Sequence, residues 1–165
     1  MSSLKLYFIL LFLFLTTAEC SLDSMEVIGH RGSPNYMPEN TLESFAVGMY
    51  SGANFIELDV QITKDHQVIV IHDPYLSRVT DIENFPEFAN RKSTRLYKNK
   101  EIQDYFVDEF TLEELQKLKV YQKLVNTRPK IFDGKFGLPT LDEVISYMTK
   151  ENSQRKSKDL NYSPV

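Results

Sequence analysis

Short apolar strands alternate with capped helices along this chain, and this order leaves few folds open. Apolar and polar residues alternate along Phe55–Gln61, whereas Val68–Ile71 is a continuous β-branched run typical of a buried strand. The expected strands are Glu26–His30, Phe55–Gln61 and Val68–Ile71, and the expected helices begin at Asn40, Thr111 and Thr140. The alternation predicts right-handed βα units and a parallel sheet, which is an α/β fold.

The three expected helices begin with similar capping signals. Asn40 is placed to cap the first helix, with Glu43 three residues later and Gly52 as the C′ residue. Thr111 and Thr140 each precede a glutamate by three residues, which is the pattern of a capping box. Apolar residues then recur at helical spacing in the first helix, at Leu42, Phe45, Ala46 and Met49.

The composition is that of an ordinary globular protein. Of the 165 residues, 42% are hydrophobic and 25% are charged, and the formal net charge is -4. These values exclude a collagen and an acidic disordered chain, and a single cysteine excludes a disulfide scaffold. Since Lys+Arg number 19 against 23 Asp+Glu, no basic excess points to a nucleic-acid partner. The length suits one domain.

Residues 1–20 have the organisation of an export signal. Lys5 precedes the apolar run Leu6–Leu15, and Ala18 and Cys20 form a small-x-small cleavage site that leaves Ser21 as the mature start. A run of this length spans about 15 Å as a helix, half of a hydrocarbon core of about 30 Å. An uncleaved N-terminal anchor is the alternative. We therefore expect export to an extracellular, periplasmic or endomembrane compartment, with no stable membrane span in the mature chain.

Two segments do not follow the βα pattern. Residues 74–109 carry several aromatic side chains without a clear period, and a structureless loop of that length is improbable in a compact domain. We expect an insertion with its own small aromatic core. Residues 150–165 are polar, lean basic and show no apolar period, so they are expected to form a tail.

Polar side chains that can carry charge stand at three strand positions. They are His30 and Arg31, Glu57 and Asp59, and His72 and Asp73. Functional sites of parallel α/β proteins form at the C-terminal ends of the strands. Because strand side chains alternate, Glu57 and Asp59 are expected on one face, where two hard oxygen donors suit Ca²⁺ or Mg²⁺.

Each of these positions has a structural alternative. The acidic pair could belong to the solvent face of an edge strand, and Arg31 could form an ordinary surface salt bridge. A single histidine at a strand end is more often a core or surface residue than a catalyst, and His66, in a charged turn, is interpreted as a surface residue. Two of the three histidines end strands that flank the acidic pair, and this combination favours a functional site.

The combination matches the needs of phosphodiester hydrolysis. One imidazole can accept a proton from the nucleophile while the other donates one to the leaving oxygen. A cation held by carboxylates offsets the charge that develops on the phosphoryl oxygens, and a guanidinium binds phosphate bidentately. A histidine-ligated zinc site is disfavoured, because the sequence lacks the H-E-x-x-H or cysteine spacing of such sites.

Four blocks of the sequence resemble the signature of the glycerophosphodiester phosphodiesterase family. The blocks are His30-Arg31-Gly32, Pro38-Glu39-Asn40-Thr41, Glu57-Leu58-Asp59 and His72-Asp73, and they occur in the family's order and spacing. The segment 74–109 is similar to an insertion that exported bacterial members carry after the second histidine. The later segments 111–118 and 138–145 resemble two less specific helices of the family.

The resemblance implies a TIM (β/α)8 barrel enzyme that hydrolyses glycerophosphodiesters to sn-glycerol 3-phosphate and an alcohol. His30 and His72 would form the acid/base pair, Arg31 would hold the phosphate, and Glu57 and Asp59 would bind a divalent cation, with Ca²⁺ expected in preference to Mg²⁺. A glycerol hydroxyl would attack first to give a cyclic phosphate, which water then opens. Glu39 and Asn40 match the motif without an assigned catalytic role.

The end of the chain departs from the family pattern, because the third metal carboxylate is expected beyond Val165. A TIM barrel takes about 250 residues, so the chain holds only the first three or four βα units and is expected to be a truncated, inactive or poorly folded N-terminal part. Such a part would expose apolar strand faces. The alternatives are a non-catalytic relative that binds phosphodiesters and a phospholipase D-like barrel enzyme, the second disfavoured by the Pro38–Thr41 block and the insertion.

Overall fold

The computed structural model describes residues 26–124 and 126–158, so the expected export signal and Cys20 lie outside the described residues. The strands are β1 (Ile28–His30), β2 (Phe55–Glu57), β3 (Val60–Ile62), β4 (Val68–Val70), β5 (Ser93–Tyr97) and β6 (Lys100–Asp104). The α-helices are α2 (Leu42–Tyr50), α3 (Leu112–Leu115) and α4 (Leu141–Ser157). Short 3-10 helices span Ile82–Asn84, Pro86–Arg91 and Val107–Glu109.

The strands pair two by two. β1 and β2 are parallel, with His30 opposite Glu57, whereas β3 pairs with β4 and β5 with β6 in antiparallel hairpins. The prediction of one continuous strand over Phe55–Gln61 is wrong, and the parallel sheet is confirmed only for β1 and β2. The strand is interrupted because the Asp59 backbone N–H donates to the side chain of Asn40 (3.3 Å).

β4 separates two hydrophobic cores. Side chains alternate along a strand, so Ile69 and Ile71 enter one core and Val70 enters the other. The predicted burial of the run is confirmed for these three side chains, which are at most 1% exposed, whereas Val68 is only partly buried. The Val70 core joins β4 to two helices, through Phe45 and Met49 of α2 and Val144 and Met148 of α4.

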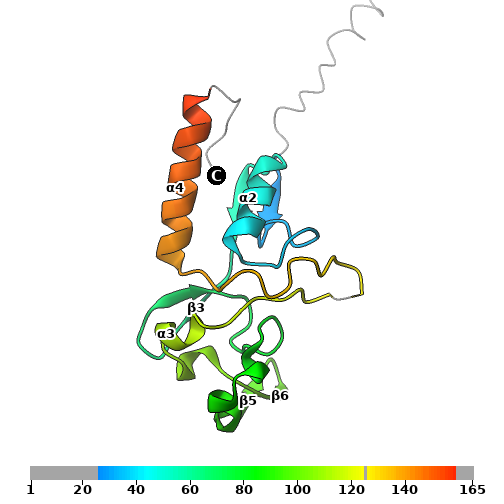
Figure 1. Ribbon diagram of the computed structural model, residues 1–165, viewed down its shortest axis with the longest axis vertical. Coiled ribbons are helices and arrows are strands. Elements are labelled where there is room, and N and C mark those ends of the chain that lie inside the picture. The colour runs from blue at the N-terminus through cyan, green and yellow to red at the C-terminus, as the bar shows by residue number, and fades with distance from the viewer. Residues whose placement is uncertain (1–25, 125, 159–165) are drawn as a thin grey trace, which may run out of the picture.

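The segment 74–109 does not have a core of its own. Its side chains Leu76, Val79, Ile82, Phe88, Tyr105 and Val107 pack with Ile69, Ile71, Phe110, Leu115, Leu118, Val120 and Leu138. The aromatic residues of the segment therefore extend the core that lies on one side of β4. Figure 1 shows this part of the chain, with β5, β6 and α3, at one end of the molecule, and α2 and α4 at the other.

Two of the three helix starts agree with the sequence. Thr111 and Thr140 both form complete capping boxes, with Glu114 and Glu143 at the N3 positions. The prediction that Asn40 caps α2 is wrong by one residue, because the Thr41 side chain accepts from the Ser44 N–H (3.2 Å). Gly52 follows the end of α2 with φ +94°, as expected of a C′ residue.

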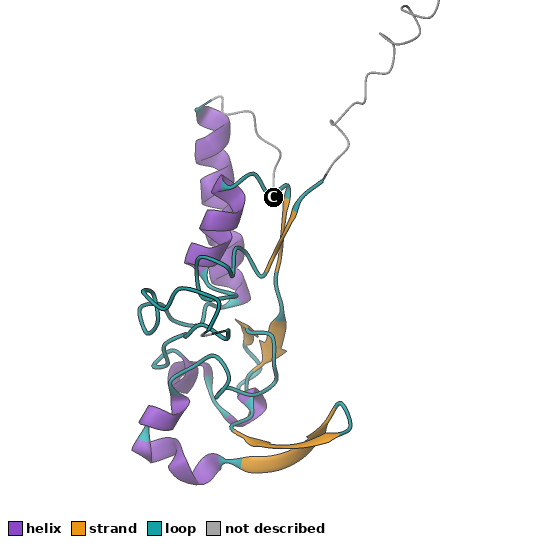
Figure 2. Ribbon diagram, turned by 90° about the vertical axis from the view of Figure 1, so that its right-hand side faces the viewer, coloured by secondary structure: helices purple, strands orange, loops and turns teal. Residues whose placement is uncertain are grey.

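The C-terminal segment is more helical than predicted. α4 continues through residues 150–157 and is the long helix in Figure 2; it packs with α2 through their shared core (Figure 1). Arg155 and Lys156 stand in its last turn, where cations stabilise the helix dipole. The rest of the expected polar tail, residues 159–165, lies outside the described residues.

Several apolar side chains on the strands face solvent. Ile28 of β1 is 61% exposed and Ile62 of β3 is 59% exposed, which agrees with the apolar strand faces expected of a partial barrel. Within residues 26–124 and 126–158, no helix combines the length and the hydropathy that crossing a bilayer requires.

Candidate functional site

The turn after β1 fixes the backbone of Arg31. Its N–H donates both to the Glu57 carbonyl oxygen (3.0 Å) and to Glu57 Oε2 (3.0 Å). Arg31 has φ +57°, a conformation that costs a non-glycine residue about 1–3 kcal/mol and is often found at functional sites. The Ser44 hydroxyl supports the turn from α2 by donating to the Arg31 carbonyl oxygen (3.0 Å) and accepting from the Ser33 N–H (2.8 Å).

The guanidinium of Arg31 lies between two carboxylates. Its Nε is 3.0 Å from Asp59 Oδ2, and its Nη1 donates to Glu39 Oε1 at 3.1 Å. The amide of Asn40 also donates to Asp59 Oδ2 (3.1 Å). The side chain of Arg31 is only 13% exposed, so these partners hold it in one orientation.

Glu57 and Asp59 can supply part of the ligand shell of a hard cation. The contacts of each carboxylate engage a single oxygen, Oε2 of Glu57 and Oδ2 of Asp59, so Oε1 and Oδ1 stay able to coordinate. Ca²⁺ takes about 6–8 oxygen ligands. Among the described residues, no group of three or more His, Cys, Asp or Glu is arranged to hold a metal ion. The two carboxylates therefore fit a cation only as a partial site.

His30 ends β1, and its imidazole lies near the carboxylate of Glu57. Its Nε2 lies 3.8 Å from Glu57 Oε2, and 68% of its side chain is exposed. The ring therefore has direct access to solvent and to any ligand that approaches the carboxylates.

His72 is more enclosed and has a fixed partner. Its side chain is 24% exposed, and Nδ1 lies 2.5 Å from Oδ1 of Asp73, whose other oxygen is paired with the Nε of Arg78. Burial raises the pKa of the Asp73 carboxyl, but the attraction of Arg78 and the hydrogen bond with His72 together lower the pKa by more than burial raises it. The pKa of Asp73 therefore lies below its ordinary value, and the group is a carboxylate at neutral pH.

The lowered pKa of Asp73 predicts that this group contributes to the loss of stability at acid pH. The unfolded chain binds a proton at Asp73 near the ordinary value of 3.8, above the pKa of the folded state. The stabilisation is thus complete above that value and is lost as the pH falls through the folded pKa. As the pH is lowered from about 4, we expect the free energy of unfolding, measured in urea, to decrease less steeply in Asp73→Asn than in the wild type. Equal pH dependence in both proteins would contradict this assignment.

Glu39 connects the two halves of the site. Its side chain is 4% exposed, and Oε1 accepts from Arg31 Nη1 (3.1 Å) and from Arg78 Nη2 (2.8 Å). Arg128 Nη1 lies 3.9 Å from Oε2. An unbroken series of contacts therefore runs from Arg31 through Glu39, Arg78 and Asp73 to His72.

The structure places the sequence-predicted residues in two groups that this series joins. His30, Arg31, Glu57 and Asp59 form the first group, and His72 with Asp73 forms the second. Among the contacts of the described residues, none joins the two imidazoles directly. Glu39 belongs to the motif Pro38–Thr41 without a predicted role, and Arg78 was not predicted, since nothing in its spacing from His72 marks it as part of a motif.

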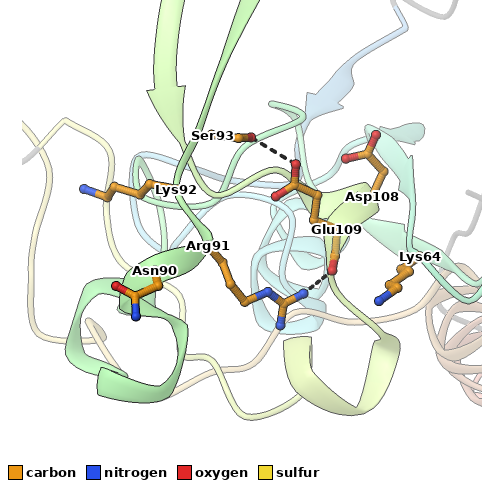
Figure 3. A pocket seen from close by; sticks show the side chains of 7 residues that line it. All are labelled: Lys64, Asn90, Arg91, Lys92, Ser93, Asp108 and Glu109. Carbon is orange, nitrogen blue, oxygen red and sulfur yellow. Dashed lines mark hydrogen bonds between the residues drawn. The ribbon is translucent and has the colours of Figure 1, made fainter.

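A polar hollow is formed by other residues of the chain. It has a volume of about 450 Å³ and is lined by Lys64, Asn90, Arg91, Lys92, Ser93, Asp108 and Glu109 (Figure 3). Two of its cations have structural partners: Arg91 pairs with Glu114 and stacks on Phe110, and Lys92 pairs with Glu83. None of the candidate site residues lines this hollow.

Known proteins resemble this chain over most of its length. A glycerophosphodiester phosphodiesterase from Arabidopsis thaliana is 37% identical over 119 residues, which are 72% of this chain and 32% of the relative. The chain thus spans about a third of that relative's length.

Solved structures also match most of the chain. An Oleispira antarctica phosphodiesterase in complex with the product sn-glycerol-3-phosphate has a TM-score of 0.53 and 28% identity, over 78% of this chain and 41% of that structure. A structure from Silicibacter pomeroyi has a TM-score of 0.58 and 27% identity, over 79% of this chain and 42% of its own. The α/β fold therefore corresponds to about two fifths of these structures, and the complete barrel stays a prediction.

The family comparison covers most of the chain. It matches residues 30–162, from the first histidine of the site to a point beyond the end of α4. The chain therefore belongs to the glycerophosphoryl diester phosphodiesterase family.

Proposed function

We propose that this chain supplies the first part of the active site of an enzyme that hydrolyses glycerophosphodiesters to sn-glycerol 3-phosphate and an alcohol. The observation that carries the proposal is the contact series that links Arg31, Glu57 and Asp59 with His72. These residues come from the ends of three separate strands. Family membership supports phosphodiester hydrolysis as the reaction that they would carry out together. The expected export signal leads us to propose further that the enzyme acts outside the cytoplasm.

The histidines differ in ways that suit acid and base roles. The Asp73 carboxylate can only accept, so His72 donates from Nδ1 and presents Nε2 as a base or as a proton donor when charged. His30 is open to solvent and lies beside the acidic pair. In the proposed reaction a glycerol hydroxyl attacks phosphorus, the bond to the head-group oxygen breaks, and that oxygen takes a proton. Water then opens the cyclic phosphate, with the same two imidazoles exchanging protons in reverse.

Arg31 is placed to bind the phosphoryl group. Its backbone is fixed by Glu57 and its side chain by Glu39 and Asp59, so the guanidinium is oriented before a ligand arrives. A preoriented guanidinium binds phosphate with less loss of entropy than a free one. A divalent cation on Glu57 and Asp59 would neutralise charge on the phosphoryl oxygens.

A chimera tests the proposal in a complete catalytic domain. Residues 26–158 would replace the corresponding segment of the Arabidopsis thaliana relative, which is 37% identical to this chain. We expect the chimera to release sn-glycerol 3-phosphate from glycerophosphocholine, measured with a coupled dehydrogenase assay. A folded chimera with no turnover, while the unmodified relative is active in the same assay, would reject the proposal.

Removal of divalent cations is expected to abolish turnover by the chimera. Chelation should stop product release and added Ca²⁺ should restore it, because Glu57 and Asp59, which both contact Arg31, would hold the cation next to the proposed phosphoryl site. Glu57→Gln should raise the Ca²⁺ concentration needed for half-maximal rate, whereas Glu101→Gln, on the exposed strand β6, should not. Activity that is indifferent to chelation would reject the cation site.

A binding function without turnover is the second candidate for this chain by itself. It is favoured by one observation, that no group of three metal ligands occurs within the described ranges 26–124 and 126–158. Binding of glycerol 3-phosphate by the chain alone, without hydrolysis of glycerophosphocholine, would support this candidate.

A further inference from the structure

Glu39 and Arg78 lie between Arg31, the proposed phosphate-binding residue, and His72, the proposed catalytic histidine. No role was predicted for either residue from the sequence. We propose that Arg78 and Glu39 are positioning residues that act through Asp73 to hold His72 in a single tautomer, with the proton on Nδ1. The inference rests on the proposed function for its purpose, but the tautomer itself can be measured without any catalysis.

Asp73 is the group that contacts His72. Its Oδ1 lies 2.5 Å from His72 Nδ1, and its side chain is 6% exposed. Because the carboxylate is ionised and can only accept, the shared proton belongs to the imidazole nitrogen. The opposite nitrogen, Nε2, is then the one that can take or give a proton to a ligand.

Arg78 fixes the orientation of Asp73. Its Nε pairs with Asp73 Oδ2, the oxygen that does not contact His72, and its Nη2 donates to Glu39 Oε1 at 2.8 Å. A planar guanidinium can contact two carboxylates at once with donors in fixed directions, which an ammonium group cannot do. The carboxylate plane of Asp73 is thereby held from the side opposite His72.

Glu39 in turn fixes Arg78. The same Oε1 that accepts from Arg78 also accepts from Arg31 Nη1 at 3.1 Å, so one nearly buried carboxylate orients both guanidiniums. The charges alternate along the series Arg31, Glu39, Arg78, Asp73. Removing one member of a buried ion pair leaves the charge of its partner uncompensated. A change at Glu39 is therefore expected to alter the tautomer of His72, although the two residues are not in contact.

Imidazole ¹⁵N spectra of the full chain test this inference. The chain has three histidines, and spectra recorded at about pH 9, well above the range in which imidazole ordinarily titrates, read each neutral tautomer directly. We expect His72 to carry its proton on Nδ1 in the wild type. In Arg78→Met the ratio of the Nδ1–H to the Nε2–H form should fall at least about tenfold, because a charge-assisted hydrogen bond loses its support. Glu39→Gln should lower the ratio in the same direction by a smaller factor.

Arg95→Met is the matched control. Arg95 also contacts two carboxylates, Asp108 and Glu109, but none of these residues contacts His72 or Asp73. The control should leave the His72 ratio unchanged, whereas a purely structural role of Arg78 would predict the same ratio in all folded variants.

Each outcome decides the inference. An Nε2–H His72 in the wild-type chain overturns it, whether or not the variants fold. A folded Arg78→Met or Glu39→Gln chain with an unchanged ratio overturns the positioning role. The variants of the chain could show the expected tautomer shifts while the chimera does not hydrolyse glycerophosphocholine. This result would uphold the positioning role and reject the proposed function.

Discussion

His72→Ala is expected to lower the rate of glycerophosphocholine hydrolysis by the chimera at least about a hundredfold, since general acid–base groups contribute about 10²–10⁴. The structure gives the reason for this expectation. Asp73 occupies Nδ1 at 2.5 Å, so His72 has one nitrogen available for proton transfer, and the ring is only 24% exposed. The loss should fall mainly on kcat, because the variant keeps Arg31, the residue proposed to bind the phosphate.

The control for this prediction is the third histidine. His66 stands in the turn before β4, and it has φ +62°. Asparagine tolerates that conformation better than alanine, so His66→Asn is the appropriate variant and should keep the parent rate. If His72→Ala also keeps the parent rate, His72 is not an acid–base group in this enzyme.

Gly32→Ala is expected to destabilise the protein by about 2–5 kcal/mol, the sum of a left-handed backbone penalty and a steric clash. Gly32 has φ +86°, and a Cβ at this position would lie 2.5 Å from the carbonyl carbon of Ser44 and 2.6 Å from its oxygen. These are backbone atoms of α2, which cannot move without displacing the helix. The turn that carries Arg31 would be displaced with it, because the Ser44 hydroxyl donates to the Arg31 carbonyl oxygen.

Gly52 provides a matched control for the steric part of that penalty. It has φ +94°, and a Cβ there would meet no atom within 4 Å. Gly52→Ala should therefore cost only the backbone penalty of about 1–2 kcal/mol. Urea unfolding of both variants measures the difference, which we expect to be about 1–3 kcal/mol. Equal destabilisation would show that α2 can yield to a side chain at position 32.

The sequence was most informative where a local signal determines the structure. Thr111 and Thr140 form capping boxes as their spacing predicts, and Ile69, Val70 and Ile71 of the β-branched run are buried. Capping and burial of this kind depend on residues within one or two turns or on the composition of one strand. The same locality explains why the candidate histidines and acidic pair could be named before the fold was known.

The remaining features depend on contacts between distant residues. The strand expected at Phe55–Gln61 is interrupted because Asp59 binds Asn40 and Arg31, which lie 19 and 28 positions earlier in the chain. Glu39 and Arg78 meet across 39 positions. No periodicity or short motif encodes such a pair, so the series of contacts that joins Arg31 to His72 becomes visible only in the folded chain.

The most direct measurement of the central claim is a titration of the chain with sn-glycerol 3-phosphate in the presence of Ca²⁺, followed by the imidazole signals of its three histidines. If the strand ends form one phosphate-ester site, the His30 and His72 signals will shift along a single binding curve while the His66 signal stays in place. Signals of His30 and His72 that do not move, that follow different curves, or that move no more than His66 would contradict the existence of a shared site.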